Sequence, residues 1–138
     1  AIPGASLVSW VSVLAAFLVA HMVGDYLLQT DWQARHKRRG LGSDPISRRA
    51  LVTHVTTYTL AFLPALVWIG VGLQPAWAVI SGVLIFVPHL LIDDGRIVQL
   101  YLVRVKRADG LNLSLAASVD QSFHVLSLFL VALLVGSA

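Results

Sequence analysis

The stretch VAHMVGDYLLQTDW (residues 19–32) decides how this chain folds, because it ends an apolar run long enough to cross a membrane. It carries His21 and Asp25 four residues apart, so both side chains would lie on one face of a helix. Ionisable side chains inside a membrane span are costly, and they often mark a functional site. The rest of the sequence must explain why a helix accepts these two groups.

The composition is typical of a membrane protein. Of the 138 residues, 57% are hydrophobic and 12% are charged, whereas a soluble domain carries about 25% charged residues. The chain has no cysteine, which excludes disulfides and thiolate metal ligands. The net charge is +3, but the basic residues lie between apolar runs. This placement indicates anionic lipid headgroups as neighbours and no nucleic-acid partner.

Four apolar segments are long enough to span a membrane, which takes about 20 residues each. They cover approximately residues 6–28, 50–71, 76–97 and 114–135. Pro64 and Pro88 lie inside two of these segments and should each kink the helix or free a carbonyl. No linker divides the chain. We therefore expect residues 1–138 to form one all-α integral membrane domain, a bundle of four transmembrane helices.

The basic residues predict the orientation of this bundle. Nine of the 10 Lys and Arg residues lie in the loop between the first two segments or the loop between the last two, and the tenth, Arg96, lies where the third segment meets that last loop. The middle loop and both termini have none. The positive-inside rule then predicts that both basic loops are cytoplasmic and that both termini lie outside.

This orientation brings ionisable side chains to one depth, near the cytoplasmic ends of the helices. HLLID (residues 89–93) and DQSFH (residues 120–124) again contain His and Asp four residues apart. His54 lies in the first two turns of its segment, at the same expected depth. The whole layer comprises His21, Asp25, His54, His89, Asp93, Asp120 and His124.

An internal repeat predicts how the helices are arranged. HMVGD (residues 21–25) and HLLID share the spacing His-x-x-x-Asp, and the next intramembrane His follows 33 residues later in the first half and 35 in the second. The pattern predicts two helical hairpins related by an axis along the membrane normal. Asp120 has no counterpart, because Ala50 occupies the matching position of the first half.

The residue types of this layer suit a transition metal. His nitrogens and Asp oxygens bind Zn, Fe or Mn, and helix bundles build such sites from pairs on facing helices. Seven candidate ligands exceed the four of a tetrahedral ion. They could hold two ions with a bridging Asp, or one ion with the other groups orienting the His rings. Two further interpretations stay open, a proton or ion path and plain interhelical hydrogen bonds.

Three residues in or beside the layer are candidates for catalysis. Asp120, which lacks a repeat counterpart, could act as a general base. Arg96, in the motif DDGR, could hold a phosphate or carboxylate. Tyr58 follows His54 by one turn and offers a hydroxyl. Gly95 suits the C-terminal cap of the third helix.

The motifs HMVGDYLLQTDWQARHK (residues 21–37), HLLIDDGR (residues 89–96) and DQSFH together resemble a family of small bacterial polytopic membrane proteins of unknown function. The resemblance covers nearly the whole chain. It implies a multi-pass protein of the bacterial inner membrane, but it implies no activity. The chain is more loosely similar to membrane-bound metal-dependent hydrolases, which also place His and Asp at the cytoplasmic ends of their helices.

The leading hypothesis is a metal-dependent membrane hydrolase that acts on a lipid or lipid-linked substrate at the cytoplasmic leaflet. One or two divalent metals would polarise a carbonyl or phosphoryl oxygen and lower the pKa of water. Oxidative chemistry at a di-iron site is an alternative reaction for the same residues. Alternatives of other classes are a proton or divalent-metal transporter or sensor and a non-enzymatic scaffold with a structural metal. The sequence is compatible with a homo-oligomer.

Overall fold

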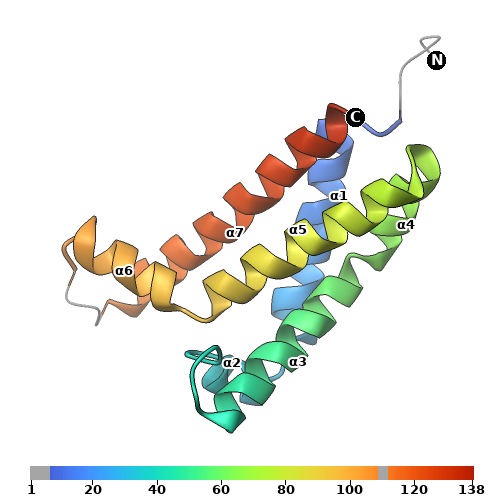
Figure 1. Ribbon diagram of the computed structural model, residues 1–138. Helices are drawn as coiled ribbons and strands as arrows, with labels where there is room; N and C mark the ends of the chain where they lie inside the picture. Colours follow the sequence, from blue (N-terminus) through green and yellow to red (C-terminus); the bar gives the residue numbers. More distant parts are fainter. Residues whose placement is uncertain (1–6, 109–111) are drawn as a thin grey trace.

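The computed structural model describes residues 7–108 and 112–138, and within these ranges the chain forms helices and no strand (Figure 1). The first half contains four α-helices and one π-helix, and the second half contains three α-helices. In chain order they are α1 (Trp10–Met22), η1 (Val23–Leu28), α2 (Asp31–His36), α3 (Pro45–Ala61), α4 (Leu63–Gly72), α5 (Pro75–Asp93), α6 (Arg96–Arg104) and α7 (Leu113–Gly136).

Three of these helical segments are long and apolar enough to cross a membrane, namely Trp10–Leu28, Pro75–Asp93 and Leu113–Gly136. The pair α3 and α4 adds a fourth span if the two helices, bent by 47° from one another, cross together. The prediction of an all-helical membrane protein is therefore confirmed, with three or four candidate spans.

Proline and glycine determine where two of the spans bend or end. The second span was expected at residues 50–71, but α3 already begins at Pro45 and the chain bends at Phe62. Pro64 lies in the first turn of α4, where its missing N–H costs no hydrogen bond. The kink expected at Pro64 is confirmed, whereas α5 continues through Pro88 as one helix. Gly95, with φ of 86°, follows α5 as expected of a C-terminal cap.

Short helices form in both segments that were predicted as basic loops. The helix α2 has a capping box in which Thr30 and Gln33 satisfy each other's backbone N–H groups. The helix α6 is amphipathic, since Val98 and Leu102 are buried while Leu100 is exposed. Neither helix has the length of a span, so apolar runs alone could not predict them.

The bundle is held together by packing between helices that are distant in sequence. The helix α7 packs against α1 and α5, while α3 packs against η1 and α5. The largest fully buried apolar side chains include Phe17, Tyr58 and Phe62. Contacts therefore join helices both within and between the two halves of the chain, and the repeat of two hairpins stays a prediction.

The outer surface of the bundle is apolar. Leu27, Val71 and Val79 expose 76%, 84% and 69% of their surface, which is costly in water but favourable against lipid. Figure 1 shows α2, α6 and the first turns of α3 at one end of the bundle, with the C-terminus and the turn between α4 and α5 at the other. Both basic segments therefore lie at the same end.

Asp94 fastens the segment after α2 to the end of α5. The backbone N–H groups of Arg39 and Leu41 donate to the main-chain oxygen and to Oδ1 of Asp94, at 2.8 and 2.9 Å. Asp44 then caps α3 by accepting from the N–H and hydroxyl of Ser47. These two hydrogen bonds hold the pKa of the Asp44 carboxyl below its usual range.

Candidate metal centre

Asp25 lies in the π-helix η1, not in the regular helix that the spacing predicted. The wider turn of a π-helix changes the direction of the side chains it carries, and such turns are frequent at functional sites. Gly24 lets η1 approach α3 closely, because a Cβ atom there would lie 2.6 Å from Cδ2 of Tyr58. The carboxyl group of Asp25 is thereby brought to the interior of the bundle, where it is 6% exposed.

Four ligand atoms from three elements converge in the bundle interior. Nε2 of His54 lies 2.9 Å from Oδ2 of Asp93 and 3.2 Å from Oδ1 of Asp25. Nε2 of His89 lies 3.1 Å from Oδ2 of Asp93, 3.5 Å from Oδ1 of Asp25 and 3.1 Å from Nε2 of His54. All four side chains are buried, so they form one compact group beneath the basic end of the molecule.

These separations match those expected around a bound ion. A tetrahedral metal with ligands at about 2.0–2.2 Å holds neighbouring ligand atoms about 3.3–3.6 Å apart. The five separations given above run from 2.9 to 3.5 Å. The four atoms therefore need to move apart by only a few tenths of an ångström to surround an ion.

One of the four atoms lacks any other partner. Oδ1 of Asp25 is buried and makes no hydrogen bond with the described residues. Its close contacts are with Nε2 of His54 and of His89, at 3.2 and 3.5 Å. A cation between Asp25 and Asp93 would offset the cost of burying this carboxylate oxygen without a hydrogen bond. Two His nitrogens and two carboxylate oxygens are also ligands that suit Zn, Fe and Mn. The residues present therefore fit a divalent transition metal.

A second group of potential ligands shares Asp93 with the first. Nε2 of His124 lies 3.0 Å from Oδ1 of Asp93 and 3.5 Å from Oδ2 of Asp120. Nδ1 of His124 lies 3.1 Å from Nδ1 of His89. Asp93 thus presents one oxygen to each group. Six of the seven residues in the predicted layer lie in these two groups.

His21 lies beside the two groups, with its ring nitrogens paired elsewhere. Nδ1 is 2.9 Å from the hydroxyl of Tyr58, and Nε2 is 2.9 Å from Oε1 of Gln121. The ring of Tyr58 stacks on His89 with centroids 3.4 Å apart, and Gln121 donates to Oδ2 of Asp120. Tyr58 and Gln121 therefore connect His21 to the metal centre, and direct ligation by His21 stays a prediction.

Lys37 is a member of the site that the sequence analysis missed. Its Nζ lies 2.8 Å from Oδ2 of Asp93, although the sequence analysis used it only as one of the charges that predict orientation. No spacing rule connects residues this far apart in sequence. The contact depends on Asp94, which ties the neighbouring backbone to the end of α5.

A cavity of about 260 Å³ connects the metal centre to the basic end of the bundle. Asp93 and Asp120 line it together with both members of a Lys-Arg pair. The lining residues are Tyr26, Ala34, Lys37, Arg38, Asp93, Gly95, Ala117, Asp120 and Gln121. Arg96 is not among them, and its Nε lies 3.4 Å from Oδ2 of Asp94. The basic residues that line this cavity are therefore Lys37 and Arg38.

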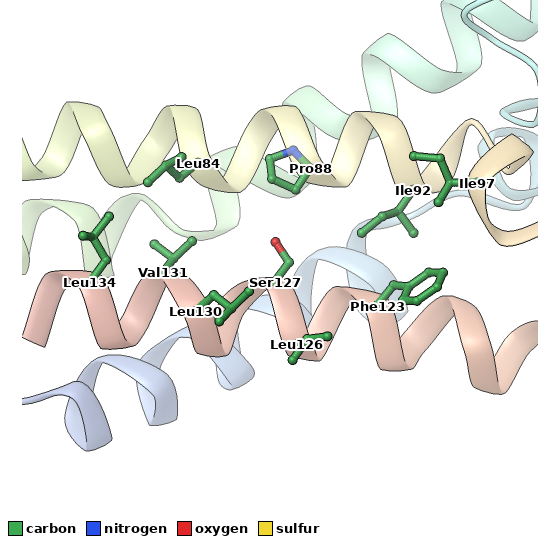
Figure 2. A pocket seen from close by; sticks show the side chains of 10 residues that line it. All are labelled: Leu84, Pro88, Ile92, Ile97, Phe123, Leu126, Ser127, Leu130, Val131 and Leu134. Atoms are coloured by element: carbon green, nitrogen blue, oxygen red, sulfur yellow. The ribbon is translucent and has the colours of Figure 1, made fainter. Parts of the chain in front are cut away.

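Apolar grooves flank α7 on the membrane-facing surface. Figure 2 shows the groove between α5 and α7, where Leu84 and Pro88 lie opposite Leu130 and Val131. It has a volume of about 480 Å³, and Ser127 is the one polar residue among its lining. A second apolar pocket of about 470 Å³ lies along α7 and shares Gln121 with the cavity described above.

Comparison with known proteins links the chain to one family. A family model with the description "Protein of unknown function (DUF3307)" matches residues 13–138. Neither the curated proteins nor the solved structures gave a match. The match covers every residue of the His/Asp layer and agrees with the resemblance to a family of unknown function. The looser similarity to metal-dependent hydrolases gains no support from these comparisons.

Proposed function

Because the chain belongs to the DUF3307 family, which has no assigned function, we propose its function from the site itself. The protein is a metal-dependent membrane hydrolase acting on a lipid or lipid-linked substrate at the cytoplasmic leaflet. The observation that carries this proposal is the convergence of four buried ligand atoms from η1, α3 and α5. The proposal also includes a location in the bacterial inner membrane, with both basic segments cytoplasmic, and an arrangement of the helices as two repeated hairpins.

In this proposal Asp25, His54, His89 and Asp93 hold one Zn, Fe or Mn ion. A divalent metal at this position would supply Lewis-acid chemistry toward a carbonyl or phosphoryl oxygen. The hydrogen bonds of the surrounding residues then fix the directions of the ligands, since second-shell partners orient His rings and tune the metal.

The contact between His89 and His124 supports one ion in place of two. Their Nδ1 atoms are 3.1 Å apart, so one must carry a hydrogen and the other must accept it. If Nε2 of both rings bound metal, both Nδ1 atoms would carry hydrogen and would repel. With His89 as the ligand, His124 accepts at Nδ1 and donates from Nε2 to Oδ1 of Asp93.

Asp120 has the position expected of a general base. Its side chain is 23% exposed, lines the cavity and accepts a hydrogen bond from Gln121. It lies outside the group of four proposed ligands, so its carboxylate is free to take a proton from water at the cavity. Tyr58 stacks on His89, and we assign it the role of positioning that ligand.

The cavity and the adjoining apolar pocket support a lipid substrate. The cavity opens at the basic end of the molecule, whereas the pocket lies along the membrane-facing side of α7. A lipid could therefore place its headgroup near Asp120 while its hydrocarbon stays in the bilayer. Such an arrangement needs no passage for a whole substrate through the bundle.

One observation favours a second candidate, a scaffold held by a structural metal. Four protein ligands complete the coordination of a tetrahedral ion, and closed sites of this kind are usually structural. Catalysis would then require the ion to add a fifth ligand or to exchange one carboxylate. The two candidates differ in turnover, not in metal content.

The test compares metal-loaded protein with protein stripped by a chelator. Protein purified in detergent should hold about one metal equivalent, and only the loaded form should convert a component of a bacterial lipid extract, as seen by mass spectrometry. Asp120→Asn should keep the metal and lose the conversion. Bound metal without conversion of any lipid would favour the scaffold, and protein that never binds metal would exclude both candidates.

A further inference from the structure

We propose that the cavity beside Asp93 is a subsite for the phosphate group of a membrane lipid, with Arg38 and Lys37 as its cationic residues. The inference rests on the proposed function and makes it more specific. A membrane hydrolase acting on a lipid could recognise many headgroups, and the inference names the phosphate as the group that is bound. The observations that carry it are the charges facing the cavity and the apolar pocket that adjoins it.

Arg38 lines the cavity and has no ionic partner among the residues that the structure describes. Its side chain is exposed and lines the opening, and it makes no hydrogen bond or ion pair with the residues of ranges 7–108 and 112–138. Nη1 lies against the end of α5, 3.4 Å from the point where a Cβ of Gly95 would be. The guanidinium group of Arg38 is therefore close to Gly95, which also lines the cavity.

The charges around the cavity favour an anion once a divalent ion is bound. The ion balances the carboxylates of Asp25 and Asp93, which are its proposed ligands. Lys37, Arg38 and Asp120 then face the opening with one excess positive charge. Guanidinium groups bind phosphate oxygens through paired hydrogen bonds, and Lys adds a point charge.

A lipid accounts for the cavity better than a free phosphate does. Gln121 lines both the cavity and the apolar pocket on α7, so the two spaces are neighbours that share its side chain. Beyond Gln121 the pocket is lined by Ser122, Val125, Leu126 and Phe129, three of which are apolar. A phosphate beside Arg38 would thus continue into a hydrocarbon chain along α7, in the part of the bundle that faces the membrane.

The test measures binding to zinc-loaded protein in detergent by calorimetry, with three probes. These are dioctanoyl phosphatidate, dioctanoylglycerol, which lacks the phosphate, and inorganic phosphate. Phosphatidate should bind at least about tenfold more tightly than either of the others, because it alone uses both the cations and the apolar pocket. In manganese-loaded protein, the phosphorus NMR signal of phosphatidate should relax rapidly because its phosphate lies close to the ion.

The variant Arg38→Gln should weaken phosphatidate binding about tenfold, the loss expected for one charge-assisted hydrogen bond. The matched control is Arg35→Gln, which removes the same charge from an exposed residue paired with Asp31 outside the cavity. It should change the affinity by less than about twofold. Metal content and melting temperature of both variants establish that each is folded.

Three results would overturn the inference. Equal binding of dioctanoylglycerol would show recognition of hydrocarbon alone, and equal binding of inorganic phosphate would replace the lipid by a free anion. Equal effects of Arg38→Gln and Arg35→Gln would remove the cavity as the phosphate subsite, and the manganese relaxation test decides the matter if Arg38→Gln does not fold. Any of these results leaves bound metal and lipid turnover untouched, so the proposed function fails only by its own test.

Discussion

Asp93 and Asp94 are neighbours in the sequence that serve different parts of the structure. Asp93 contacts His54 and Lys37 through Oδ2 and His124 through Oδ1, whereas Asp94 receives the backbone hydrogen bonds of the segment after α2. The first carboxylate thus joins the residues of the candidate metal centre, and the second positions Lys37 above it. Both are buried, so each has to be fully paired to be tolerated.

The first prediction concerns Asp25→Asn, which keeps the shape of the side chain and removes its charge. Oδ1 of Asp25 makes no hydrogen bond in the described chain and lies 3.2 Å from Nε2 of His54, another proposed ligand, so we expect its charge to contribute mainly to metal binding. The variant should lose metal affinity by more than about 100-fold, beyond the range of second-shell changes. Elemental analysis of purified protein measures this effect.

The control for Asp25→Asn is Asp31→Asn, at an exposed residue paired with Arg35, which should hold as much metal as the natural chain. Retention of metal by Asp25→Asn would remove this residue from the ligand set.

The second prediction separates a ligand from a residue that orients one. His54→Gln should abolish metal binding, because Nε2 of His54 lies in the group of four ligand atoms. His124→Gln should weaken binding by only about 10–100-fold and still reach one equivalent at saturating metal. Titration with zinc, followed by elemental analysis, distinguishes the two variants. Two equivalents in the natural chain, with one lost in His124→Gln, would instead establish a second metal position.

The His/Asp pairs could be predicted from sequence because their geometry is local. Residues four apart on one helix lie together, so spacing and membrane orientation alone assign seven side chains to one layer, and six of these form the two groups observed. Lys37 and Gln121 could not be found in this way. Their contacts with Asp93 and His21 depend on how separate elements pack, and no local pattern encodes that packing.

At the scale of elements, η1 is the feature that the sequence did not indicate. Apolar periodicity predicts a helix, but it does not distinguish an α-turn from the π-turn of Val23–Leu28. The bend between α3 and α4 could be predicted, because Pro64 acts on the adjacent backbone. The extent of α3 could not, since its first turns begin in the polar segment at Pro45, ahead of the apolar run.

The third prediction concerns Gly24→Ala, which tests the contact between η1 and α3. The added Cβ would lie 2.6 Å from Cδ2 and 3.2 Å from Cα of Tyr58, and the backbone atom cannot move aside as a flexible side chain can. The helix η1 should shift away from α3, taking Asp25 away from His54. We expect a loss of about 1–3 kcal/mol in stability, as for overpacked cores, together with weaker metal binding.

The control for this prediction is Gly82→Ala in α5, where the added Cβ would meet Cδ1 of Leu66 at an ordinary distance of 3.6 Å. Thermal unfolding and zinc titration of both variants check the result. Equal behaviour of the two variants would mean that close packing at Gly24 does not position Asp25.

At the scale of the whole molecule, the distribution of charge and the position of the site agree. The basic residues of α2, α6 and the segment after α2 lie at one end (Figure 1), and the cavity to the metal centre opens among them. The outward surface elsewhere consists of exposed Leu, Val and Ile side chains. A lipid bilayer would cover that surface and leave the basic end in water on one side and the opposite end, with the C-terminus, in water on the other.

The fourth prediction is the topology that this arrangement requires. By the positive-inside rule, both basic segments should be cytoplasmic and the C-terminus should lie outside. Single cysteines introduced at Ser43 and Ser137 can test it, because the natural chain has none. In intact cells a membrane-impermeant thiol reagent should label Ser137→Cys and not Ser43→Cys, and permeabilised cells should label both. The reverse pattern would direct the cavity away from the cytoplasm.

The fifth prediction concerns the stability of the bundle, which a bound ion should increase by joining η1, α3 and α5. Without the ion, the carboxylates of Asp25 and Asp93 remain buried close together, and the folded state bears the cost of that repulsion. Stability should then rise by about 1.4 kcal/mol for each tenfold increase in free metal above the dissociation constant. Thermal unfolding in detergent, with chelator or with graded zinc, measures this dependence. The melting temperature of Asp25→Asn should be insensitive to zinc, because its ligand set is incomplete. If the natural chain shows the same insensitivity, its His and Asp residues serve as interhelical hydrogen bonds and not as a metal centre.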